Sequence, residues 1–92
     1  MFSAEMLRLW KLAAQQELPD AQLDLATAYY NGTIVKQDYE KAHMWWSIAA
    51  VWGYEPAKKW REIVAEKMTA QQIAEAQKLA TECQARNFKN CD

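Results

Sequence analysis

The residues of this chain that could carry out chemistry are few and scattered. His43 is the only histidine, and the two serines, Ser3 and Ser47, do not stand in the strand–turn–helix setting of a catalytic nucleophile. No set of metal ligands accompanies His43 at the spacing of a zinc site. We therefore expect His43 to be a surface side chain. A hydrolase built on His43, Ser47 and Cys83 is the function class that the sequence favours least.

Acidic residues gather in the first half of the chain, at Asp20, Asp24, Asp38 and Glu40. Paired carboxylates can serve as general acid and base, but Asp38 is better explained as a helix N-cap and Asp20 as an acid at a helix start. Gly32 and Gly53 are isolated, so the chain has no glycine-rich phosphate loop. The sequence therefore predicts no enzyme, no cofactor and no metal.

Two cysteines, Cys83 and Cys91, stand eight residues apart near the end of the chain. In one continuous helix they would be about 12 Å apart, too far for a disulfide bond. A bond requires the chain to turn back near Asn87, a residue that tolerates a left-handed stop. Both a disulfide and two unpaired thiols remain open. A disulfide would indicate a periplasmic or secreted protein, and free thiols a cytoplasmic one.

The composition is that of a small, folded, soluble helical domain. Of the 92 residues, 51% are hydrophobic and 25% are charged, and the net charge of −1 offers no electrostatic case for binding nucleic acid or an anionic membrane. Two glycines and two prolines are too few for the turns of a β-sandwich or barrel. No apolar run reaches the ~20 residues that a membrane span needs. The start of the chain, which contains Glu5, does not resemble a signal peptide.

An internal repeat underlies the chain. The segment Trp10–Ala14 reads WKLAA, and Trp46–Ala50, 36 residues later, reads WSIAA. At this shift four residues are identical and two more are apolar in both copies, the identical pairs being Trp10/Trp46, Ala13/Ala49, Ala14/Ala50 and Ala21/Ala57. A period in the mid-thirties made of helices is typical of helix-turn-helix solenoids.

Apolar spacing and stop signals predict five helices, at about residues 1–16, 20–30, 39–52, 55–67 and 69–86. Asn31 and Gly32 end the second helix, and Gly53 ends the third. Asp38 caps the third helix. Thr69 and Gln72 form a capping box for the fifth. The inward stripes place Trp10, Trp45, Trp46 and Trp60 in the core.

From Ala13 to Lys58 the chain resembles the Sel-one-like repeat (SLR) family, relatives of the tetratricopeptide solenoids. The residues that carry the resemblance are Ala13, Ala14, Ala21, Gln22, Leu25, Tyr29, Gly32, Val35, Asp38, Lys41, Ala42, Trp45, Ala49, Ala50, Gly53 and Ala57. Glu17, Ala26 and Ile34 stand where the family pattern has glycine. At Ile34 we expect a conflict, because a β-branched residue disfavours the backbone angle that a loop glycine takes.

The resemblance implies an all-α fold, an α/α superhelix of about five antiparallel helices in a single domain spanning 1–92. Residues 1–16 would be a partial repeat, 17–53 a complete repeat and 54–92 the C-terminal capping helices. It further implies a bacterial, non-enzymatic scaffold that binds another protein or peptide.

Two binding surfaces are predicted. The first is a solenoid groove with the candidate contacts Gln22, Asp24, Tyr30, Asn31 and Trp52, of which Tyr30 and Trp52 are the exposed aromatic candidates. The second is the first predicted helix, at about residues 1–16, called here the edge helix because the helix that would precede it in a complete repeat is missing. Its edge residues, which also point inward, are Met6, Leu9 and Trp10. This edge would be covered by a second copy of the chain, by a different partner or by further repeats of a longer solenoid. The alternative function is therefore that of a structural or regulatory subunit that self-associates through this edge.

Overall fold

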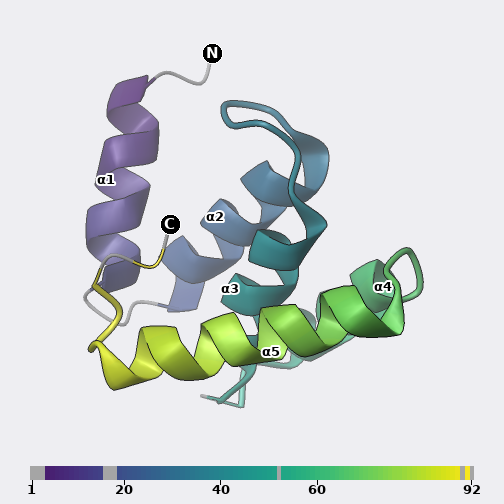
Figure 1. Ribbon diagram of the computed structural model, residues 1–92. Helices are drawn as coiled ribbons and strands as arrows, with labels where there is room; N and C mark the ends of the chain where they lie inside the picture. The colour runs from purple at the N-terminus through teal and green to yellow at the C-terminus, as the bar shows by residue number, and fades with distance from the viewer. Residues whose placement is uncertain (1–3, 16–18, 52, 90, 92) are drawn as a thin grey trace.

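The computed structural model describes residues 4–15, 19–51, 53–89 and 91, and every regular element among them is a helix (Figure 1). The five helices are α1 (Ala4–Gln15), α2 (Pro19–Asn31), α3 (Tyr39–Val51), α4 (Glu55–Ala65) and α5 (Ala70–Ala85). Helix α1 packs on α2, α2 packs on α3, and α3 also packs on α4 and α5. The all-α fold is confirmed, with α4 ending two residues before the expected boundary. Within the described residues, no helix is long and apolar enough to cross a membrane.

The turn between α2 and α3 is formed as the sequence predicts, with one correction. Gly32 takes a left-handed φ of +69°, and its N–H donates to the carbonyl of Ala28 at 2.8 Å. Asp38 caps α3, because its Oδ1 accepts from the N–H of Lys41 at 3.1 Å. The expected conflict at Ile34 does not arise. Ile34 is not among the residues with positive φ, so the glycine that the loop requires is Gly32.

Side chains connect and cap the later helices. Thr69 and Gln72 form the predicted capping box at the start of α5, with hydrogen bonds of 2.9 and 3.1 Å. The hydroxyl of Tyr54, just before α4, donates to Asp20 Oδ1 at the start of α2 over 2.8 Å. This bond links the residue before α4 to the first turn of α2.

The chain reverses after α5 and is held there by a disulfide bond. Asn87 and Phe88 have φ values of 55° and 64°, and the N–H of Phe88 donates to the carbonyl of Cys83 at 2.8 Å. The turn brings the Cα atoms of Cys83 and Cys91 to 5.3 Å, and their sulfurs are bonded. Of the two states that the sequence left open, the structure therefore has the bridged one, with the predicted left-handed stop at Asn87.

Helix α3 is the centre of the molecule. Trp45, Trp46, Ile48 and Ala49 are all at most 1% exposed. Helix α3 has α2, α4 and α5 around it, so it buries nearly all of its circumference rather than one stripe. This arrangement decides the environment of its polar residues.

Candidate functional site

Gln22 does not face a groove, contrary to the sequence-based expectation. Its side chain is fully buried, and its Nε2 donates to the carbonyl of Ala14 in α1 at 3.3 Å. Its Oε1 has no hydrogen-bond partner in the described part of the chain. The amide therefore joins α2 to α1, and a partner protein cannot reach it.

Asp24 and Asn31 do lie together, in a hollow of about 210 Å³ between α1 and α2. Trp10 lines the same hollow, so the structure places an edge residue beside two groove residues. Partial burial raises the pKa of Asp24, and the nearby charge of Asp20 raises it further. The hollow is therefore a poor place for an additional negative charge.

Tyr30 points to another side of α2. It follows Asp24 by six residues, which turns it by about 120° around the helix, whereas Asn31 follows Asp24 by two full turns. The ring of Tyr30 belongs to an aromatic cluster made of Tyr30, Tyr39, Trp46 and Trp60, with centroid distances of 5.6–6.3 Å. The predicted groove set is thus divided between two surfaces, and Trp52 lies outside the described residues.

Trp60 is the exposed member of the aromatic cluster, although the sequence predicted it in the core. It is 43% exposed, while Trp46, on which it stacks at 6.0 Å and 22°, is 1% exposed. The buried stripe of α4 runs through Ala57 and Val64. Trp60 lies at the border of that stripe, so one of its faces packs on the core and the other meets solvent.

The edge helix α1 also differs from expectation. Leu9 and Leu12 are 51% and 44% exposed, whereas Met6 and Trp10 are partly buried. Leu7 packs against the core and Ala14 is fully buried, so the inward stripe runs through Leu7 rather than Leu9. The outer face of α1 nevertheless presents apolar side chains, as an edge helix would.

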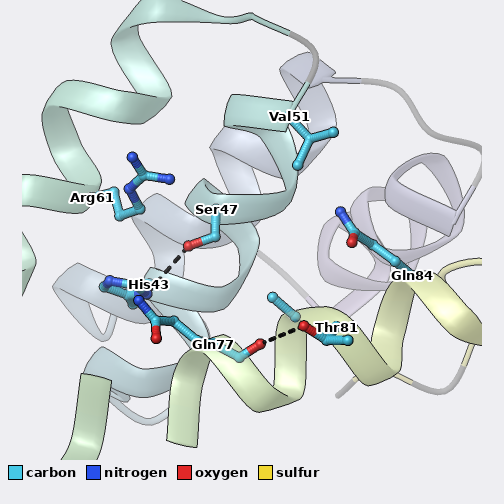
Figure 2. Close-up of a pocket in the computed structure, with 8 residues that line it drawn as sticks. His43, Ser47, Val51, Arg61, Gln77, Thr81 and Gln84 are labelled. Carbon is cyan, nitrogen blue, oxygen red and sulfur yellow. Dashed lines mark hydrogen bonds between the residues drawn. The ribbon is translucent and has the colours of Figure 1, made fainter. Parts of the chain in front are cut away.

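A second concave region, which the sequence did not reveal, lies between α3, α4 and α5. This open groove of about 440 Å³ is called here the Arg61 groove (Figure 2). Its polar lining residues are His43, Ser47, Arg61, Gln77, Thr81 and Gln84. Arg61 comes from α4, and the others come from positions one or two turns apart on α3 and α5. This spacing alone does not distinguish a groove from a solvated helix face.

His43, expected on the surface, is 3% exposed at the side of this groove. Its Nδ1 lies 3.3 Å from Ser47 Oγ. Burial lowers the pKa of His43, and the positive charge of Arg61 lowers it further, so the ring is neutral at pH 7. The expectation failed because α4 and α5 also pack beside the face of α3 that carries His43 and Ser47, where Arg61 lines the same groove.

The groove does not have the arrangement of a hydrolytic site. Ser47 contacts His43, but among the described residues no carboxylate orients the imidazole, as a catalytic triad requires. Cys83 is bonded to Cys91 and offers no thiol. The described residues also contain no cluster of three or more side chains able to hold a metal ion.

A sequence model of the Sel1 repeat matches residues 19–50, which span α2, the turn and α3. No curated protein and no solved structure gave a significant match. The match covers the part of the chain where Gly32 and Asp38 form the turn described above. Sel1 repeats generally mediate protein–protein interaction. Residues 19–50 therefore resemble a Sel1 repeat, and the all-helical fold is consistent with a helical repeat of this kind.

Proposed function

We propose that this protein is a binding module that recognises another protein through the aromatic cluster, with Trp60 as the central contact and Tyr30 beside it. The observation that carries the proposal is that Trp60 is 43% exposed although it stacks on a buried tryptophan. An exposed tryptophan of this kind offers a large apolar area to a partner.

The stacking of Trp60 lowers the entropic cost of binding. Tyr30 lies 6.3 Å from Trp60 and Trp46 lies 6.0 Å from it, so the ring has neighbours on its inner side in the free protein. Less rotamer freedom is then lost when a partner covers the outer face. Tryptophan and tyrosine are also enriched among residues that dominate binding energy.

Site-specific photo-cross-linking tests the proposal. A photoreactive amino acid replaces Lys59, an exposed residue next to Trp60, and the protein is irradiated in cells that express it. A matched probe replaces Glu75, an exposed residue on α5. We expect a discrete cross-linked protein from the Lys59 probe that is absent from the Glu75 probe.

Substitution then assigns the contact. Once the partner is purified, Trp60→Ala should weaken its binding by at least tenfold, as expected of a residue worth more than 1.4 kcal/mol. Leu12→Ala removes an apolar side chain of similar exposure from α1 and serves as the control. Equal affinities for the Trp60 and Leu12 variants, with both proteins folded by circular dichroism, would exclude the aromatic surface.

Self-association through α1 is the second candidate function, and the exposure of Leu9 and Leu12 favours it. Light scattering over a concentration series should then report a dimer that Leu9→Lys converts to a monomer. The Trp60→Ala variant should remain dimeric. A wild-type monomer at all concentrations would exclude this candidate.

A further inference from the structure

The Arg61 groove holds a positive charge that no acid neutralises within the described part of the chain. The packed stripe of α4 runs through Ala57 and Val64, both of which are fully buried. Trp60 borders this stripe on one flank, and Arg61 borders it on the other flank. It forms no ion pair with a described carboxylate. None of the residues that line the groove is acidic.

Neutral hydrogen-bonding groups surround this charge. The side-chain amides of Gln77 and Gln84 come from α5 and make no hydrogen bond to a described residue, which leaves their N–H groups for a ligand. In Figure 2, Gln77 lies with Arg61 and His43 on one side of the groove, and Gln84 lies on the other side, with Ser47 between them. A group that enters the groove therefore meets donors from two helices.

We propose that the Arg61 groove binds a carboxylate group. A guanidinium presents paired N–H donors that match the two oxygens of a carboxylate, and the amide N–H groups of the glutamines can complete its hydrogen bonding. A single cation balances one negative charge, so a monoanion fits this groove better than a phosphate dianion. The carboxylate can belong to a small molecule or to the C-terminus of a peptide. The site is separate from the aromatic cluster and does not depend on the function proposed above.

Nuclear magnetic resonance titration of the full chain tests this inference. Sodium acetate is added at constant ionic strength, and the side-chain amide signals of Gln77 and Gln84 and the Nε–H signal of Arg61 are followed. We expect saturable shifts at these groups. Sodium phosphate at the same concentration should give a weaker effect.

Two pairs of variants identify the site. Arg61→Gln should weaken acetate binding by about tenfold, the value of a charge-assisted hydrogen-bond pair. Lys59→Gln, which removes an exposed cation from the same helix, should not. Gln84→Glu should weaken binding by repulsion, whereas Gln71→Glu places the same charge at an exposed position near the start of α5 and should leave it unchanged.

A second titration distinguishes a small-molecule carboxylate from a peptide C-terminus. It uses N-acetyl-dialanine, which has a free peptide C-terminus. Tighter binding than acetate identifies a peptide terminus, and equal or weaker binding identifies a small carboxylate. The proposal is overturned if shifts are not saturable, if phosphate binds as tightly as acetate, or if Arg61→Gln binds like the wild-type protein. None of these outcomes depends on Trp60.

Discussion

His43 shows how one residue can make stability depend on pH. Its pKa is lowered in the folded protein, first by burial and then by Arg61, so the unfolded chain binds the proton more readily. The stability that the neutral ring contributes is present above the unfolded pKa, near 6.5. It is lost as the pH falls below that value toward the folded pKa.

We therefore expect the free energy of unfolding to decrease between about pH 7.5 and 5, the range around the ordinary pKa of histidine. Urea denaturation at a series of pH values measures this dependence. His43→Gln, which keeps a polar side chain, should flatten the profile over that range. Parallel profiles for both proteins would show that His43 is not the source of the dependence. The raised pKa of Asp24 has the opposite effect on stability at lower pH. The folded protein binds this proton more readily than the unfolded chain, so the contribution of Asp24 to the free energy of unfolding increases as the pH falls.

The environments of single residues were the part of this molecule that its sequence predicted least well. His43 and Gln22 are buried although they are polar, and Trp60 is half exposed although it is aromatic. A helical period tells which residues share a face, but not how many neighbours cover the helix. Helix α3 is covered from several sides and α4 is not. The helical period therefore underestimated the burial of His43 on α3 and overestimated the burial of Trp60 on α4.

Elements were predicted much better, because their ends are set by local interactions. Asp38 at the start of α3 and Thr69 with Gln72 at the start of α5 accept the hydrogen bonds that their residue types predict. The match to the Sel1 repeat falls within Ala13–Lys58, the segment that carries the resemblance to the family. The Arg61 groove could not be predicted in this way, since it depends on the packing of three helices.

The two left-handed glycines allow the turn to be tested. A Cβ at Gly32 would lie 3.1 Å from Gln37 Cβ, whereas a Cβ at Gly53 would meet nothing within 4 Å. Both substitutions to alanine carry the conformational cost of positive φ, about 1–2 kcal/mol. Gly32→Ala should lower the free energy of unfolding by more than Gly53→Ala, as measured by urea denaturation. Equal losses would mean that the contact with Gln37 relaxes without cost.

At the scale of the whole molecule, the disulfide bond is the interaction most open to direct test. It closes a short loop, with a sequence separation of 8, and its buried end is Cys83. Restricting the unfolded chain over a loop of this length contributes about 2–3 kcal/mol in the entropic model.

Reduction should therefore lower the midpoint of thermal unfolding by roughly 10–20 °C for a domain of this size. Differential scanning calorimetry with and without a phosphine reductant measures the change. A Cys83→Ala, Cys91→Ala double variant should melt at a low temperature that the reductant does not alter. If the wild-type protein melts at the same temperature in both buffers, the bond does not contribute to stability.

The packing of α1 has a consequence for how the molecule opens in time. Helix α1 rests mainly on α2, whereas α3 is surrounded and α5 is followed by a covalent closure. Amide protons exchange with solvent through local openings, and the least enclosed helix opens with the smallest free energy. Hydrogen exchange should therefore begin in α1, proceed to α2 and reach α3 last. Such an order would release α1 while the rest of the solenoid remains folded, leaving the buried amide of Gln22 newly accessible.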